Sequence, residues 1–105
     1  MMVLRGVNIF PIQIEKILMS FAELSNNYLI TLTTDDDNDN MTVEVEITEL
    51  FTDDYGRLRS LNNEITRALK DEILLTPHVK LVPKGTLPVS EGKAVRVVDK
   101  RKVYQ

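Results

Sequence analysis

The chain of 105 residues has no cysteine, no tryptophan and a single histidine, and these absences exclude several kinds of site. Without cysteine there is no disulfide framework and no thiolate metal site, which suits a reducing compartment. No serine or cluster of carboxylates accompanies His78 in the sequence, so we interpret it as a surface or hydrogen-bonded residue rather than a base. Because no glycine-rich loop of the Walker type is present, this chain alone is not expected to bind ATP tightly.

The sequence also lacks long apolar runs. The apolar residues of Met1–Gly6 are too few for the core of a signal peptide, and no other run approaches the length that crosses a bilayer. We therefore expect a soluble, cytoplasmic protein with no membrane contact. The length fits one domain that spans residues 1–105, and 43% hydrophobic residues allow a modest core.

Charge is unevenly distributed along the chain. The net charge is −3, but residues 1–75 hold 6 Lys and Arg against 14 Asp and Glu, whereas residues 76–105 hold 7 against 2. The basic end favours a phosphorylated ligand or an acidic protein surface, although a basic tail that only increases solubility would have the same composition. RNA binding is not expected, because the predicted strands carry threonine, glutamate and apolar residues instead of exposed aromatics beside basic charge.

The order of predicted elements indicates an α+β domain. Apolar periodicity, proline and turn residues predict the following elements in order: a strand over 2–4, a helix from Pro11, strands over 28–34 and 41–47, a helix over 53–73 and a strand over 79–82. Residues 94–98 add an extra C-terminal strand or short helix, of which we favour the strand. The result is a small β-α-β-β-α-β sheet domain with two helices on one face.

Two polar segments between these elements also carry predictions. Asn8 is expected to cap the first helix or to hold the turn before it. The acidic segment Asp35–Asn40 favours a tight hairpin turn between two strands. A calcium site is the alternative, but this segment lacks the central glycine and the distal glutamate of the helix-loop-helix calcium motif, so we favour the turn and leave ion binding open.

Lys93 lies in a stretch, residues 87–96, that contains Pro88 and Gly92. Proline fixes one backbone angle and glycine permits unusual ones, so the stretch is predicted to be a loop that presents one lysine. A flexible ammonium group in such a loop is suited to an anion that arrives from outside the domain. Taken alone, the stretch does not distinguish this role from that of an ordinary solvated lysine.

A second motif, at the other end of the chain, favours a functional role for Lys93. The stretches Leu4–Pro11, with residues 13–15 after it, and Leu87–Arg101 resemble the two signature stretches of the C-terminal domain of adenylate-forming acyl-CoA ligases. Within that family, phenylacetate-coenzyme A ligases read R-G-V-N-V/I-F-P and S-E-G-K-A at these places, as Arg5–Pro11 and Ser90–Ala94 do here. The resemblance covers essentially the whole chain, and two motifs in the correct order are far more specific than either alone.

The resemblance implies a mobile lid domain of an AMP-forming phenylacetate-CoA ligase. Such enzymes make an acyl-adenylate from an aryl acid and ATP with Mg²⁺, release diphosphate, and then turn this domain so that coenzyme A attacks the adenylate. The N-terminal adenylation domain, which holds the nucleotide (ATP or AMP) and most of the acid pocket, is expected to be the partner and is not contained in these residues. The chain begins just after the family's hinge position, and alone it is expected to be inactive.

The same resemblance assigns roles to individual residues. Lys93 matches the lysine that reaches the substrate carboxylate and the nucleotide phosphate during adenylation. Gly6 matches a glycine whose missing side chain lets the backbone approach the pantetheine channel of coenzyme A, and Arg5, which replaces a further glycine, is a candidate for contacting a coenzyme A phosphate. Glu15 matches a family glutamate, although electrostatics at the helix end explains it equally well. Val89 departs from the Arg or Lys of many relatives, which puts one phosphate or domain contact in doubt.

One hypothesis from a different class stays open. A stand-alone module that senses a small metabolite, or that forms a homodimer through its sheet edges, has the same order of elements. This hypothesis gives no reason for the two motifs to occur together, and we therefore favour the ligase domain.

Overall fold

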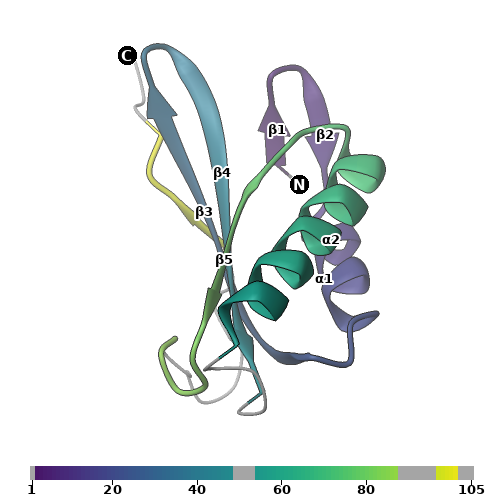
Figure 1. The fold of residues 1–105 in the computed structure, drawn as a ribbon. Coiled ribbons are helices and arrows are strands. Elements are labelled where there is room, and N and C mark those ends of the chain that lie inside the picture. The colour runs from purple at the N-terminus through teal and green to yellow at the C-terminus, as the bar shows by residue number, and fades with distance from the viewer. Residues whose placement is uncertain (1, 49–53, 88–96, 102–105) are drawn as a thin grey trace.

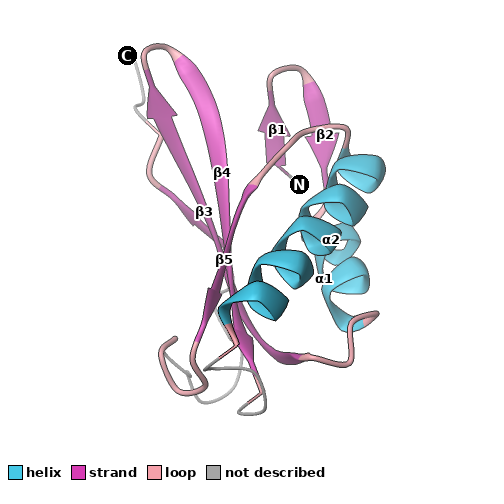
Figure 2. Ribbon diagram, viewed as in Figure 1, coloured by secondary structure: helices cyan, strands magenta, loops and turns pink. Residues whose placement is uncertain are grey.

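The computed structural model describes residues 2–48, 54–87 and 97–101 (Figures 1 and 2). Its elements follow one another in this order: β1 (Met2–Leu4), β2 (Val7–Ile9), α1 (Pro11–Met19), β3 (Leu24–Asp35), β4 (Asn38–Ile47), α2 (Tyr55–Ile73), β5 (His78–Val82) and β6 (Val97–Asp99). The α+β class and the two predicted helices are confirmed, and the extra C-terminal element is a strand.

The main sheet has four strands in the order β5-β4-β3-β6. β3 and β4 form an antiparallel hairpin, while β5 runs parallel to β4 and β6 parallel to β3. Both helices lie on one face of this sheet, and the short β1–β2 hairpin lies on the same side (Figure 1). The first predicted strand thus differs from expectation in its place: β1 pairs with β2 in a separate sheet, because the chain turns back at once after Leu4.

The hairpin of β3 and β4 follows the predicted alternation. Met41, Val43, Val45 and Ile47 are buried, and their pairing partners on β3 share the same face. Asp36 and Asp37 form the tip with φ values of 49° and 66°, which is typical of the two-residue turns that match the twist of a hairpin. The predicted turn is therefore confirmed. Within residues 2–48, 54–87 and 97–101, no group of three His, Cys, Asp or Glu side chains is placed to hold a metal ion.

The helices begin at different kinds of cap. Phe10 precedes α1, where its backbone N–H donates to Gln13 Oε1 at 2.8 Å and its carbonyl accepts from the Gln13 N–H at 2.9 Å. The expectation that Asn8 caps this helix is wrong, because Asn8 lies in β2 opposite Val3. Asp54 caps α2 by accepting a bond from the Arg57 N–H at 3.0 Å. Proline at the first position of α1 and the carboxylate cap of α2 explain where the helices start.

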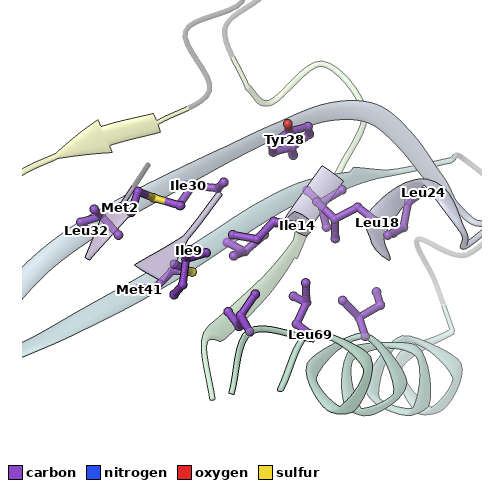
Figure 3. Close-up of a cluster of buried hydrophobic side chains, with 14 of the residues drawn as sticks. Met2, Ile9, Ile14, Leu18, Leu24, Tyr28, Ile30, Leu32, Met41 and Leu69 are labelled. Atoms are coloured by element: carbon purple, nitrogen blue, oxygen red, sulfur yellow. The ribbon is translucent and has the colours of Figure 1, made fainter. Parts of the chain in front are cut away.

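The core lies between the two helices, the β1–β2 hairpin and the main sheet (Figure 3). Its central side chains are fully buried and come from every layer, as Ile9, Ile14, Ile30, Val43 and Leu69 show. A buried side chain of this size contributes roughly 1.5–3 kcal/mol by leaving water, so burial of Ile9 helps to hold the β1–β2 hairpin on the core. No helix in the described part of the chain is long and apolar enough to cross a membrane.

Candidate functional site

The Arg5–Gly6 turn joins β1 to β2 and stands out from the domain. Leu4 pairs with Val7, so the turn has only two residues, and their φ values are 48° and 80°. Positive φ at both positions suits glycine at the second and strains most other residues. Both turn residues are exposed, whereas Leu4 and Ile9 at the base of the hairpin are buried. The sequence thus builds a firmly packed hairpin with an exposed tip.

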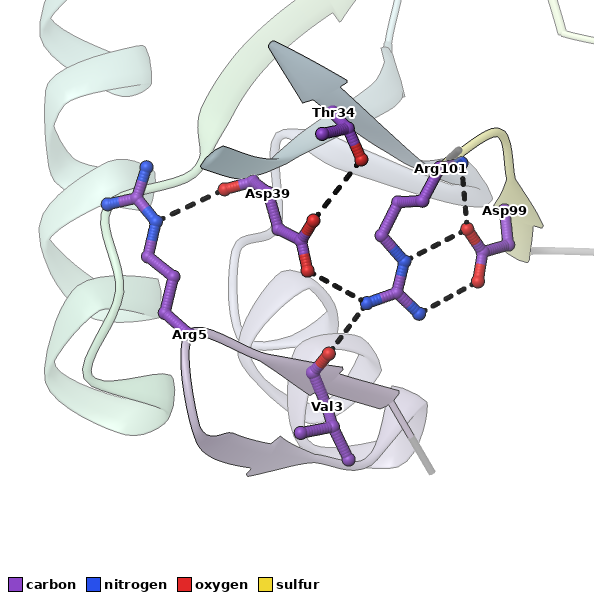
Figure 4. Close-up of polar contacts among 6 residues, drawn as sticks. All are labelled: Val3, Arg5, Thr34, Asp39, Asp99 and Arg101. Carbon is purple, nitrogen blue, oxygen red and sulfur yellow. Dashed lines mark hydrogen bonds and ion pairs between the residues drawn. The ribbon is translucent and has the colours of Figure 1, made fainter. Parts of the chain in front are cut away.

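The side chain of Arg5 folds back toward the tip of the β3–β4 hairpin (Figure 4). Its Nε donates to the Asp39 carbonyl at 3.1 Å, and its Nη2 lies 3.4 Å from Asn40 Oδ1. A cavity of about 20 Å³ lies beside these residues, which is room for about one water molecule.

Arg101 connects the β1–β2 hairpin with the β3–β4 hairpin and with the edge strand β6 (Figure 4). Its Nη1 donates to the Val3 carbonyl at 2.6 Å and to Asp39 Oδ2 at 3.1 Å. Its Nε and Nη2 donate to the two carboxylate oxygens of Asp99 at 3.0 and 2.8 Å, a bidentate arrangement. Asp39 also accepts a bond from Thr34 Oγ1 at 3.2 Å. One guanidinium therefore bonds to residues of β1, β4 and β6.

The ion pair of Arg101 with Asp99 stays charged at neutral pH. The hydrogen bonds from Arg101 lower the pKa of Asp99, and the bonds to Asp99 and then to Asp39 raise the pKa of Arg101 in spite of partial burial. In the sequence, Arg101 belongs to the basic end of the chain and ends the second signature stretch, and neither pattern indicates its contacts. Its partners lie up to 98 positions away, and no local pattern indicates them.

Replacement of Arg101 is expected to destabilise the domain. Arg101→Ala removes the side-chain hydrogen bonds to Val3, Asp39 and Asp99. We expect this loss to lower the free energy of unfolding by about 1–3 kcal/mol. Urea unfolding followed by circular dichroism measures this loss. Arg101→Lys keeps the positive charge but lacks the planar guanidinium group, so its stability should fall between those of the wild-type chain and Arg101→Ala. Lys100→Ala, an exposed neighbour, is the control, and equal midpoints for both alanine variants would contradict the assignment.

Lys93 lies outside the described residues, as do Pro88, Val89 and Gly92. The structure describes the residues on either side of this segment. Leu87 before it is buried, with 6% of its surface exposed, and Val97 after it pairs with Ile30 of β3.

A buried carboxylate, Glu46, holds the chain just before that segment. Only 4% of Glu46 is exposed, and its Oε2 accepts bonds from the Leu87 N–H at 2.9 Å and from Asn27 Nδ2 at 2.8 Å. The preceding residues form a turn in which the Thr86 N–H donates to the Pro83 carbonyl at 3.1 Å, with Gly85 at φ 88°. The sequence does not indicate this role, because alternation along the strand over 41–47 assigns Glu46 to the polar face.

The bonds to Glu46 favour its charged form. Burial alone would raise the pKa of Glu46, but bonds from the backbone N–H groups of Gly85 and Leu87, from Asn27, and the charge of Lys84 together lower it. A lowered pKa in the folded state means that Glu46 stabilises the fold at neutral pH. This stability is lost as the pH falls below the ordinary glutamate value of about 4.3 and through the folded-state pKa.

A pH series tests this electrostatic contribution. Glu46→Gln should decrease the free energy of unfolding at pH 7 and make it fall less steeply between about pH 5 and pH 3, because glutamine does not titrate. Urea unfolding at each pH measures the slope. Glu44→Gln, on the same strand, serves as the matched control, because Glu44 is only half-buried, whereas Glu46 is buried. Parallel curves for the wild-type chain and Glu46→Gln would contradict the assignment.

Comparison with protein families decides the class of this domain. The model of the AMP-binding enzyme C-terminal domain matches residues 6–101. The chain belongs to this family. The family predicted from the two motifs is therefore confirmed.

Individual relatives of known structure or curated name support this family assignment. A crystallised domain of a phenylacetate-coenzyme A ligase from Bacteroides vulgatus is 67% identical, with a TM-score of 0.92 over 99% of this chain and 95% of that one. The phenylacetate-coenzyme A ligases of Thermus thermophilus and Pseudomonas putida are 34% and 38% identical over 97% and 96% of this chain. The chain spans only 26% and 23% of their lengths, about a quarter.

Proposed function

We propose that this chain is the C-terminal domain of an AMP-forming phenylacetate-CoA ligase, which converts ATP, phenylacetate and coenzyme A into phenylacetyl-CoA, AMP and diphosphate. The 67% identity to a phenylacetate-coenzyme A ligase domain, over nearly the full length of both chains, carries this proposal. The partner is an N-terminal adenylation domain, to which we assign the ATP and Mg²⁺ sites. ATP and coenzyme A are metabolites of the cytoplasm, where we place the enzyme.

Two segments of the chain serve the two half-reactions in this proposal. In the first, the Lys93 ammonium stabilises the charge that develops on the carboxylate and α-phosphate as the acyl-adenylate forms. In the second, the Arg5–Gly6 turn approaches coenzyme A. Its exposed position supports this role, because a two-residue turn without a side chain at Gly6 enters a narrow channel more easily than a wider loop.

Arg5 has the capacity to bind a phosphate of coenzyme A without leaving its position. A guanidinium has five N–H donors, and the two bonds to Asp39 and Asn40 use only two of them. The remaining donors suit a phosphate, which planar guanidinium groups bind through paired hydrogen bonds. The contacts to the β3–β4 tip would meanwhile limit the freedom of the side chain.

The alternation of two states is supported by a more distant fold relative. A 2-hydroxyisobutyryl-CoA ligase, 24% identical, has been solved with its adenylate and coenzyme A in the thioesterification state and with its adenylate in the postadenylation state. This chain matches the two structures with TM-scores of 0.88 and 0.81. We propose that the present domain likewise turns as one body between the two half-reactions.

The test is to supply the missing domain. The chain is fused behind the adenylation domain of the Pseudomonas putida relative, in place of that enzyme's own C-terminal domain. We expect phenylacetate-dependent ATP–diphosphate exchange and phenylacetyl-CoA formation from the fusion, and neither from the chain alone. A folded fusion no more active than the adenylation domain alone would contradict the proposal.

A further inference from the structure

We propose that Glu46 and Asn27 are positioning residues for the adenylation half-reaction, because they fix the chain at Leu87, immediately before the lysine segment, residues 88–96. This inference rests on the proposed function of Lys93. Neither residue needs to touch a substrate. Their role is to hold one end of the segment that carries the cation.

The position of Glu46 in the sheet is what makes it a firm support. β4 is an inner strand with β3 on one side and β5 on the other, and Glu46 itself pairs with Val82 of β5. Its neighbours Val45 and Ile47 point into the core, so the Glu46 side chain lies on the opposite face of the sheet, away from the helices. Burial of a carboxylate there costs free energy unless it is hydrogen-bonded. The bonds to the chain before the lysine segment meet that need.

Asn27 completes the arrangement from the neighbouring strand. Its Nδ2 donates to Glu46 Oε2 at 2.8 Å and lies 3.4 Å from the Leu87 carbonyl. The peptide groups around Leu87 are thus contacted at both N–H and carbonyl, while the Leu87 side chain is buried. Together these contacts fix the direction in which the chain leaves Leu87.

The other end of the lysine segment is fixed on the same strand. Val97 pairs with Ile30 of β3, and the Lys100 N–H donates to the Leu32 carbonyl at 2.7 Å. Asn27 and Ile30 both belong to β3, so each end of the segment is contacted by a residue of that strand. Loss of the Glu46 contacts would release one end and leave the other. Because catalysis depends on placement to within about 1 Å, a rate loss of up to about 10²-fold is expected from such a release.

Hydrogen exchange of the 105-residue chain tests the structural half of the inference. Glu46→Gln keeps the shape but replaces a charged acceptor with a neutral one, and Asn27→Ala removes the second support. Both variants should exchange the amide hydrogens of Gly85 and Leu87 faster than the wild-type chain, with exchange in the middle of α2 unchanged. Glu44→Gln is the control. Unaltered exchange at Gly85 and Leu87 would overturn the inference, whether or not the fusion enzyme is active.

The fusion enzyme tests the functional half. Glu46→Gln should slow ATP–diphosphate exchange about 10- to 100-fold and leave phenylacetyl-CoA formation from added phenylacetyl-adenylate within about twofold. Equal loss in both half-reactions would show a merely structural role and overturn the inference. Full exchange activity in a folded Glu46→Gln fusion would do the same, provided that Lys93→Ala abolishes it. If Lys93→Ala itself retains exchange, the proposed role of Lys93 fails instead.

Discussion

Lys93→Ala in the fusion enzyme is expected to slow phenylacetate-dependent ATP–diphosphate exchange by about 10²–10³-fold. That magnitude is typical when one group that stabilises developing charge is removed from a site sheltered from water. Formation of phenylacetyl-CoA from added phenylacetyl-adenylate should stay close to wild type, because the second half-reaction does not use this charge. The two assays on one protein preparation therefore separate the role of the lysine from a general loss of structure.

Charge and shape can be separated with further variants. Lys93→Arg keeps the positive charge but spreads it over a larger planar group, so we expect partial exchange activity. Lys80→Ala removes an exposed lysine of β5 and should leave both half-reactions unchanged. If Lys93→Ala slowed both half-reactions equally, or neither, the assignment of this lysine to adenylation would be wrong.

The helices and the strands other than β2 (Val7–Ile9) were predictable because their signals are local. Alternation of apolar residues located β4 from Met41, and helical spacing located α2 to within two residues of its start at Tyr55. The ends of the β3–β4 hairpin were missed, since Ser25–Asn27 and Asn38–Asn40 are polar although they belong to the strands. Alternation reports burial, whereas backbone pairing continues beyond the buried part.

The contacts around the site were not predictable in the same way. Arg101 meets Asp39 across 62 positions, and Glu46 meets Leu87 across 41. Both contacts depend on the order of the strands in the sheet. The first strand was expected within this sheet, but the edge position beside β3 is occupied by β6, and β1 lies in a separate sheet. The two motifs indicated which residues act in the family. The structure adds the residues that hold the Arg5–Gly6 turn and the chain leading to the lysine segment.

Substitutions of Gly6 should separate backbone strain from obstruction of the coenzyme A channel. A Cβ at this position meets no atom within 4 Å in the domain itself, so strain at φ 80° is the cost of any substitution to the fold. For Gly6→Ala and Gly6→Leu we expect a similar decrease in the free energy of unfolding, about 1–2 kcal/mol. Thioester formation, in contrast, should decline with side-chain size, because only the approach to coenzyme A makes the space around the turn narrow.

Gly6→Asn distinguishes these two effects most clearly. Asparagine tolerates positive φ better than other residues with side chains, so this variant should remain nearly as stable as the wild-type domain while carrying a side chain into the channel. We expect slower phenylacetyl-CoA formation from added phenylacetyl-adenylate, with little change in ATP–diphosphate exchange. Thioester formation that follows the loss of stability across the three variants, rather than side-chain size, would show that the turn only supports the fold. A decline with size in equally stable domains would place Gly6 against coenzyme A in the second half-reaction.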